Sequence, residues 1–344
     1  MKVLVVGGTG FIGRPLVREL ARLGHEVAVL TRRATPIDLP AQAIVGERRD
    51  LERLCPRVDV AVDLILSSGA QAQRAMETFR GMARRVVAAS SMDVYRACGI
   101  LHGSEEGPLQ EVPLTEDAEL RTKLETYPPA SLQALRQIFP WVDDAYDKIP
   151  VERAIRGNAD LPGTVLRLPM IYGPGDRLHR LHGLLKRMDD GRERILLEEG
   201  WEHWRAPRGY VDNVAAAIAL AAVSGKAAGR VYNVAETPAC TEREWAARIA
   251  AAAGWWGEFA VLPEDCMPPH LHQQGNSAQH WEADSTRIRH ELGFREPVPP
   301  GEAIARTVEW ERANPPADFN PHRFDYAAED AATLAPRTDN PPTV

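Results

Sequence analysis

Three glycines near the start of the chain have the spacing of a phosphate-binding loop. Gly7, Gly10 and Gly13 form the pattern G-x-x-G-x-x-G. Glycines at such positions let the main chain approach a pyrophosphate closely, and a helix that starts there offers free N–H groups and the positive end of its dipole. The chemistry expected of this loop, with its intervening Phe11 and Ile12, is dinucleotide binding.

The segments on either side supply the strand and the helix that the loop requires. Residues 3–6 are a short, β-branched apolar run, typical of a fully buried strand. A periodic segment follows from Pro15 and ends at Gly24, and proline suits a first helical turn because its missing N–H costs nothing there. This strand–turn–helix context favours dinucleotide binding over a purely structural glycine turn.

A second strand is expected at residues 27–30, and Arg32 and Arg33 stand at its end. In this arrangement an acidic residue holds the ribose 2′-hydroxyl of NAD, whereas an arginine accommodates the 2′-phosphate of NADP. The acidic residue is missing, so the sequence predicts NADP as cofactor, with NAD possible. The alternative is that both arginines are ordinary solvated surface residues.

Strands and helices then alternate. Further strands are expected at 43–46, 58–66 and 85–89, with a helix at 71–84 between the last two. This alternation predicts an α/β fold with a doubly wound parallel sheet, the Rossmann arrangement. Leu66 and Ser67, at the carboxyl end of the fourth strand, are expected to line the cofactor crevice.

Composition excludes several classes of protein. The chain has 344 residues and a net charge of −7, which indicates no nucleic-acid partner. No apolar run approaches about 18 residues, so no transmembrane helix is expected. Four scattered cysteines and the absence of a signal-peptide pattern favour a cytoplasmic protein. His270 and His272 lack further ligands at metal-binding spacing, so no metal is expected.

Five motifs in order resemble the extended short-chain dehydrogenase/reductase superfamily, of the NAD(P)-dependent epimerase/dehydratase type. They are GGTGFIG at 7–13, SSMDVY at 90–95, PLTED at 113–117, K-x-x-x-E at 148–152 and LRLPMIYGPGD at 166–176. The resemblance spans about residues 1–312. It implies hydride exchange between nicotinamide C4 and a carbon of a small-molecule substrate, coupled to proton transfer at the substrate oxygen.

The resemblance also implies roles for individual residues. Lys148 would contact the nicotinamide ribose and lower the pKa of a catalytic tyrosine. Asp50 and Leu51 would lie against the adenine, and Pro169 near the nicotinamide. The substrate-binding residues implied are Ser91, Met170 and either Arg205 or Arg208, the arginine clamping a diphosphate if the substrate is a sugar nucleotide.

One departure from the family's pattern bears on catalysis. The family pairs its residues as Y-x-x-x-K, but the position four before Lys148 is Asp144, and the nearest tyrosine is Tyr146. Residues two apart on a helix point to different faces. Pro150 favours a helix that begins near Ile149, in which case Tyr146 is free of that restriction.

Three interpretations of the departure stay open. Tyr146 is a displaced acid/base; or Asp144 or Asp93 does that work, Asp93 falling where related sugar-nucleotide dehydratases carry a proton-moving glutamate; or the relay is gone, leaving a catalytically inactive dinucleotide-binding protein with a regulatory or interaction role. Tyr127 is a more distant candidate, with no lysine at the needed spacing.

The expected domain organisation follows the motifs. The Rossmann domain comprises 1–168 and 208–235, a smaller substrate lobe comprises 169–207 and 236–312, and a Pro-rich tail comprises 313–344. Residues 96–143 are expected to be an irregular insertion with one helical stretch at 132–138, serving as a lid or as surface decoration. The family's common pairing predicts a homodimer through helices 71–84 and 149–158.

Overall fold

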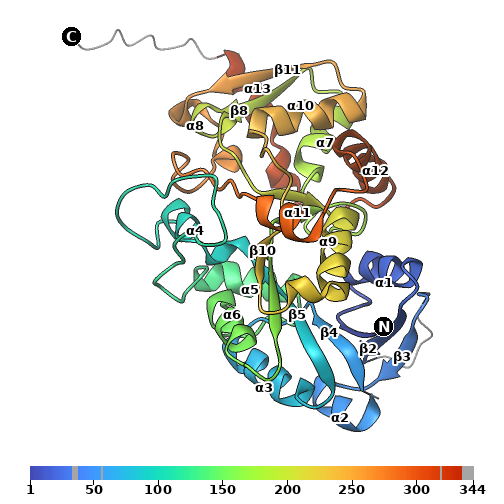
Figure 1. The fold of residues 1–344 in the computed structure, drawn as a ribbon. Coiled ribbons are helices and arrows are strands. Elements are labelled where there is room, and N and C mark those ends of the chain that lie inside the picture. Colours follow the sequence, from blue (N-terminus) through green and yellow to red (C-terminus); the bar gives the residue numbers. More distant parts are fainter. Residues whose placement is uncertain (33–37, 56, 318–319, 335–344) are drawn as a thin grey trace.

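A seven-stranded parallel sheet in the order β10-β6-β5-β4-β1-β2-β3 forms the centre of the protein (Figure 1). The computed structural model describes residues 1–32, 38–55, 57–317 and 320–334, so Arg33 lies outside the described residues. The strands are β1 (Lys2–Val6), β2 (Glu26–Thr31), β3 (Gln42–Val45), β4 (Val58–Asp63), β5 (Ala83–Ser91), β6 (Gly163–Leu168) and β10 (Val231–Asn233). The order reverses between β1 and β4, which confirms the predicted doubly wound fold.

Both faces of the sheet are covered by helices. Successive side chains of a strand point to opposite faces, so Val3 and Val5 join one apolar cluster and Leu4 and Val6 join another. The helices that cover the first face are α1 (Gly13–Arg22) and α9 (Val211–Val223); those that cover the second are α2 (Leu51–Leu54), α3 (Gly69–Phe79) and α6 (Lys148–Arg156). This double burial explains the continuous apolar run of β1.

The third loop glycine allows α1 to pack closely on the end of β1. A Cβ atom at Gly13 would lie 2.1 Å from the Gly7 carbonyl oxygen and 2.6 Å from Gly8 Cα. Gly7 itself has φ +86°, a left-handed conformation that favours glycine. The two glycines therefore satisfy backbone requirements of the turn, and Gly10 stands between them.

The later part of the chain builds a second group of elements, in the upper half of Figure 1. Two pairs of parallel strands belong to it: β7 (Met170–Tyr172) with β9 (Arg208–Tyr210), and β8 (Arg194–Glu198) with β11 (Glu258–Leu262). Its helices are α7 (His182–Asp189), α8 (Glu199–Glu202), α10 (Glu242–Ala253), α11 (Thr286–Leu292) and α12 (Pro300–Ala313). Thr241 and Glu244 form a capping box at the start of α10, a local pattern that is also readable in the sequence. Among the described residues no helix has the length and apolarity needed to cross a membrane.

The described part of the C-terminal tail packs on the protein as an arm that ends in α13 (Tyr326–Leu334). Glu329 on this helix is buried and forms an ion pair with Arg187 of α7 at 2.7 Å. His270 Nε2 lies 3.0 Å from the same carboxylate, and His272 Nε2 lies 2.8 Å from the Met267 carbonyl oxygen. Both histidines thus have hydrogen-bond partners within the chain.

The 96–143 segment contains more helix than the sequence predicts. It holds α4 (Arg96–Leu101) as well as α5 (Pro129–Ile138), which starts three residues before the expected 132. The prediction of an irregular chain at 96–101 is therefore wrong. The sequence gives little sign of α4, because the helix has only six residues and no side chain caps its start. Its residues Ala97–Leu101 are all buried, so tertiary packing stabilises it.

Helices α3 and α6, the pair expected at a dimer interface, pack closely on each other. A Cβ atom at Gly69 would lie 2.7 Å from the Cβ atom of Pro150. Val151 and Ile155 belong to the protein's own core, whereas Arg74 on α3 and Arg153 on α6 are exposed. The apolar spacing on α6 is accounted for by this core. A homodimer through these helices stays a prediction, and light scattering at micromolar concentration would test it.

Candidate active site

The carboxylate of Asp93 is the centre of the candidate site, just beyond the end of β5. The Asp93 N–H donates to Ser91 Oγ at 3.2 Å, which starts the short 3₁₀ helix Met92–Val94. Asp93 is fully buried. Its Oδ2 accepts hydrogen bonds from the hydroxyl of Tyr146 at 2.9 Å and that of Tyr127 at 3.2 Å. Its Oδ1 has no hydrogen-bond partner in the part of the chain that the structure describes.

Lys148 lies beside this carboxylate as the first residue of α6. The Asp147 side chain caps the helix by accepting from the Ile149 N–H at 2.7 Å. Lys148 Nζ donates to the carbonyl of Leu66 and lies 3.4 Å from that of Ala89. The ammonium group therefore lies near the carboxyl ends of β4 and β5, at the edge of the sheet where doubly wound folds bind their ligands.

The start of α6 explains how Tyr146 reaches Asp93. Tyr146 precedes the helix, so helical spacing does not direct its side chain away from that of Lys148, whose Nζ is 5.8 Å from the tyrosine ring centroid. Asp144 has an 85% exposed side chain and forms an ion pair with Arg136 at the surface. The structure thus brings Tyr146 to the site and leaves Asp144 outside it.

Burial dominates the electrostatics of the site. It raises the pKa of Asp93, against the opposing effects of the Arg121 charge, the Tyr146 hydrogen bond and the Lys148 charge. Burial also lowers the pKa of Lys148 to about 8, although the charge of Asp93 acts in the opposite direction. Because of burial and then the charge of Asp93, the pKa values of Tyr146 and Tyr127 lie well above the usual value.

These directions correct one expectation. The resemblance implies a lysine that lowers the pKa of the catalytic tyrosine, but the neighbour bonded to the Tyr146 hydroxyl is a carboxylate, and the pKa of Tyr146 rises. Tyr146 therefore remains a phenol near neutral pH. The two groups whose pKa values shift toward neutrality are Asp93 and Lys148.

A buried network holds α6 in register with the sheet. Glu152, one turn after Lys148, accepts from Ser90 of β5 at 2.6 Å. Arg167 of β6 donates to the same carboxylate through Nε at 2.9 Å and Nη2 at 2.8 Å. Such a bidentate pair fixes orientation as well as distance. The K-x-x-x-E spacing thus ties Lys148 to the ends of β5 and β6.

The 96–143 segment covers the site. It supplies Tyr127, and its Trp141 ring centroid lies 5.3 Å from Lys148 Nζ. These contacts place part of the segment over Lys148 and Asp93, and its role as a lid stays a prediction. Tyr127 lies 34 residues from Asp93 in sequence, so no spacing rule signals their contact.

Ser67 anchors this cover. Its Oγ accepts from the Asp143 N–H at 3.1 Å and its carbonyl accepts from the Asp147 N–H at 3.0 Å. Ser67 is fully buried. The structure therefore gives Ser67 a role in holding the segment before α6, where the sequence suggests a cofactor contact.

The glycine loop has an open face that fits a pyrophosphate. Gly10 N–H donates to the Gly7 carbonyl at 3.0 Å, and a Cβ atom at Gly10 would meet only that carbonyl oxygen, at 3.2 Å, within 4 Å. Phe11 and Ile12 follow as half-buried residues. When bound, a dinucleotide would lie with its pyrophosphate against this loop, supplying hydride chemistry at its nicotinamide.

The residues expected near the adenosine differ in their exposure to solvent. Arg32 is exposed directly after β2. The Asp50 carboxylate accepts from the Glu47 N–H at 3.0 Å, whereas Leu51 is fully buried in the core. The Leu51 side chain belongs to the buried apolar cluster on the second face of the sheet, and its contact with the adenine stays a prediction.

An ion pair at the end of β4 is not among the predictions from the sequence. Arg48 donates to the fully buried carboxylate of Asp63 through Nε at 2.9 Å and Nη2 at 3.0 Å. Burial raises the pKa of Asp63, against the effect of Arg48. The available signal was a charged residue, Asp63, that directly follows the apolar run Val60–Val62.

Both arginines expected at a substrate diphosphate have intramolecular partners. Arg205 donates to the Ala239 carbonyl. Arg208 is buried, forms an ion pair with Glu242, and lies 4.6 Å from the Trp245 ring centroid. Arg205 keeps a 34% exposed side chain, whereas that of Arg208 is 7% exposed. Pro169 and Met170 are half-buried at β7, and Met170 packs against the cluster that contains Met92.

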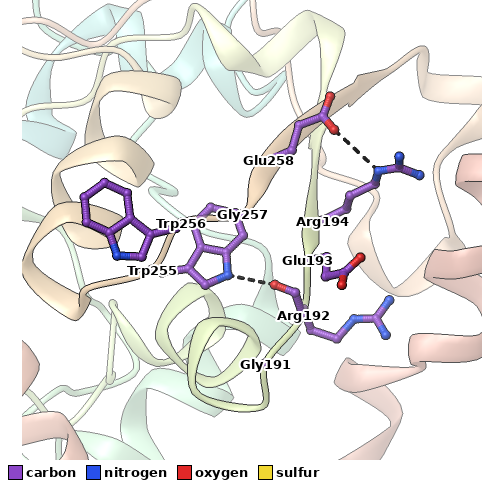
Figure 2. Close-up of a pocket in the computed structure, with 8 residues that line it drawn as sticks. All are labelled: Gly191, Arg192, Glu193, Arg194, Trp255, Trp256, Gly257 and Glu258. Carbon is purple, nitrogen blue, oxygen red and sulfur yellow. Dashed lines mark hydrogen bonds and ion pairs between the residues drawn. The ribbon is translucent and has the colours of Figure 1, made fainter.

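A separate hollow of about 580 Å³ lies at the amino-terminal ends of β8 and β11 (Figure 2). Trp255 Nε1 donates to the Arg192 carbonyl at 2.7 Å, and Glu258 lies 3.4 Å from Arg194. Trp256 is 95% exposed and lines this hollow, whereas Trp201, Trp204 and Trp281 belong to a buried apolar cluster. None of the predicted site residues lines this hollow.

A doubly wound sheet, an open glycine loop and a lysine at the strand ends together define a dinucleotide-dependent short-chain dehydrogenase/reductase fold. Residues 3–235 match the NAD dependent epimerase/dehydratase family. The chain belongs to this family, and the predicted relationship is confirmed. It is an NAD(P)-dependent epimerase/dehydratase- or reductase-type enzyme, and the catalytically inactive alternative is not favoured.

Comparisons with individual proteins agree. The chain is 28% identical to a 3-diazoavenalumate denitrifying reductase from a Streptomyces species over 74% of this chain and 82% of that one. It is 27% identical to the 2-alkyl-3-oxoalkanoate reductase of Stenotrophomonas maltophilia over 74% and 76%. The structure of MoeE5 in complex with UDP-glucose and NAD matches with a TM-score of 0.62 and 22% identity, covering 91% of this chain and 99% of that one.

Proposed function

We propose that this enzyme catalyses NAD(P)-dependent hydride transfer at a carbonyl or hydroxyl carbon of a small molecule, and that Asp93 and Tyr146 form its proton-transfer pair. The observation that carries the proposal is the 2.9 Å hydrogen bond between the Tyr146 hydroxyl and the buried Asp93 carboxylate, with Lys148 beside them. A buried titratable pair at the ligand-binding edge of a sheet is typical of a catalytic site.

In the reductive direction, a nicotinamide, when bound, would provide the hydride for the substrate carbon. The Tyr146 hydroxyl donates its proton to the substrate oxygen, and protonated Asp93 returns a proton to the phenolate oxygen through their hydrogen bond. Because burial raises the pKa of Asp93, the protonated carboxyl persists to higher pH than in water. The Ser91 hydroxyl orients the substrate oxygen, and Lys148 holds the nicotinamide ribose.

The proposed substrate class rests on the resemblance, on the contacts of two arginines and on the relatives. The resemblance predicts a sugar nucleotide as one candidate, and MoeE5 was solved with UDP-glucose. A diphosphate at these residues would share Arg205 with the Ala239 carbonyl or Arg208 with Glu242. Two relatives are named as reductases of compounds that carry no nucleotide in their names. We therefore propose a small keto compound as substrate, with a sugar nucleotide as the second candidate.

Transfer of an isotopic label tests this function. NADPH deuterated at C4 is incubated with the enzyme and either 3-oxoalkanoates or UDP-linked keto sugars. We expect deuterium at the reduced carbon of a keto compound, and mass spectrometry of the product measures it. If the enzyme binds cofactor yet transfers no label to either group of substrates, the proposal of carbonyl reduction is wrong.

Cofactor preference is a separate prediction. We expect NADP(H) to bind more tightly than NAD(H), since no acidic residue follows β2 and Arg32 is exposed there. A charge-assisted hydrogen bond contributes about 1.5–3 kcal/mol, so Arg32→Ala should weaken NADP(H) binding by roughly 10- to 100-fold and leave NAD(H) binding unchanged. Calorimetric titration measures both affinities.

Arg22→Ala is the matched control, because Arg22 is an exposed residue at the far end of α1 that pairs with Glu19. Its replacement should alter neither affinity. Equal affinities of the native enzyme for the two cofactors would contradict the NADP prediction, as would an Arg32→Ala enzyme that binds NADP(H) normally.

A further inference from the structure

Arg121 is a buried arginine of the covering segment whose guanidinium group is engaged on every side. Its side chain is 0% exposed. Nε donates to the Asp93 carbonyl at 2.6 Å, and Nη2 donates to Asp147 Oδ2 at 2.9 Å. Nη2 also donates to Thr126 Oγ1 at 2.9 Å, and Nη1 to the Lys123 carbonyl at 2.6 Å.

These contacts join the separate segments that make the candidate site. Asp147 stands between Tyr146 and Lys148, and its other carboxylate oxygen caps α6. The carbonyl that Arg121 holds belongs to Asp93 itself. One planar group therefore bridges the main chain of the carboxylate residue and the residue that separates the tyrosine from the lysine.

The same clamp reaches Tyr127. Thr126 Oγ1 lies 3.1 Å from Asp147 Oδ2 and accepts from Arg121, so the residue before Tyr127 is fixed at the cap of α6. From this fixed position in the covering segment, the Tyr127 hydroxyl donates to the Asp93 carboxylate. The covering segment is thus attached to the reacting groups through hydrogen bonds of defined direction.

We propose that Arg121 is a positioning residue for proton transfer, whose guanidinium fork keeps the Asp93 carboxylate and the Tyr146 hydroxyl in hydrogen-bonding geometry. This inference rests on the proposed function of the Asp93–Tyr146 pair. Arginine suits the task because its donors lie in a rigid plane and it stays charged, whereas the ammonium group of lysine is a single point on a long chain.

The charge of Arg121 also affects the pKa of Asp93, so the positioning role can be tested by the pH dependence of the reaction. The titratable and charged groups that face Asp93 are Arg121 and Tyr127 from the covering segment, Tyr146 and Asp147 before α6, Lys148 on α6 and Cys98 on α4. Arg121 lowers the pKa of Asp93 against the effect of burial. Loss of its charge should therefore raise the pKa of Asp93 further.

The test compares Arg121→Met and Arg121→Lys with the native enzyme. We expect Arg121→Met to lower kcat by about 10²-fold, the loss associated with misplaced reacting groups, and to move the Asp93 ionisation in the kcat profile to higher pH. Arg121→Lys keeps the charge without the fork, so kcat should fall while the ionisation stays near its native pH. NADP(H) affinity should be unchanged in both variants.

Arg187→Lys is the matched control, since Arg187 is an equally buried, ion-paired arginine in the C-terminal lobe. Any loss of thermal stability in this variant should leave the pH profile of kcat unchanged. Circular dichroism establishes which variants fold. If both Arg121 variants fail to fold while Arg187→Lys folds, Arg121 supports the whole domain and the positioning role is refuted.

The remaining outcomes separate the two proposals. Arg121 variants with native kcat and a native pH profile overturn the positioning role while Asp93→Asn and Tyr146→Phe remain damaging. If Asp93→Asn and Tyr146→Phe both have native kcat, the proposed proton-transfer pair is wrong and the inference about Arg121 falls with it.

Discussion

Asp93→Asn and Tyr146→Phe should each lower kcat by roughly 10²–10⁴-fold, the contribution expected of a positioned acid/base group. The phenylalanine variant lacks the hydroxyl that would meet the substrate oxygen. The asparagine variant keeps an oxygen that can accept from Tyr146 and Tyr127 but cannot exchange a proton with either. Steady-state kinetics with the deuterated cofactor and the accepted substrate measures both effects.

Both substitutions should leave the fold intact. Asp93 Oδ2 would still accept from Tyr127 when the Tyr146 hydroxyl is removed. Burial raises the pKa of Asp93 above its usual 3.8, so ionisation of this group disfavours folding. Below pH 3.8 the native enzyme and Asp93→Asn should have the same stability. As the pH rises through the elevated pKa, Asp93→Asn should become the more stable, which thermal unfolding at several pH values measures.

Two further substitutions serve as controls for the Asp93–Tyr146 pair. Asp144→Asn changes an exposed carboxylate bound to Arg136 and should leave kcat unchanged. Tyr127→Phe removes the longer of the two hydrogen bonds to Asp93, so its effect should be smaller than that of Tyr146→Phe. A native rate in Tyr146→Phe together with a damaged Asp144→Asn enzyme would show that the proton carrier lies elsewhere.

Gly10→Val should abolish cofactor binding in a protein that still folds. A Cβ atom at Gly10 would lie 3.2 Å from the Gly7 carbonyl oxygen and meet nothing else within 4 Å, so a shift of a few tenths of an ångström gives a side chain room. That room is the open face of the loop, where the pyrophosphate is expected to approach. Calorimetric titration of NADP(H) into the variant measures the loss, and circular dichroism confirms the fold.

Two other glycines make this experiment specific. Gly13→Val should fail to fold, because its Cβ atom would lie 2.1 Å from the Gly7 carbonyl oxygen, inside the packing of α1 on β1. Gly301→Val, at an open position of α12, should bind cofactor normally. A folded Gly10→Val protein with native affinity would show that the cofactor does not use this loop.

The sequence by itself determined the elements that depend on neighbours along the chain. The β1 run, the glycine turn and the start of α1 follow one another within residues 2–22, so their pattern predicts their structure. The capping box of Thr241 and Glu244 is likewise a local arrangement. The helical spacing of Lys148 and Glu152 predicted which side chains lie one turn apart. These predictions succeed because the interactions that stabilise them span only a few residues.

The tertiary structure decided which groups surround Asp93. Tyr127, Tyr146 and Arg121 reach it from positions 28–53 residues away, so no spacing along the chain relates them. The direction of each pKa shift depends on burial, which only the packed fold creates: a lysine next to a tyrosine predicted a lowered pKa, but a buried carboxylate on the phenol raises it. Asp144 and Asp93 were equivalent candidates by type, and the fold left one in water and enclosed the other.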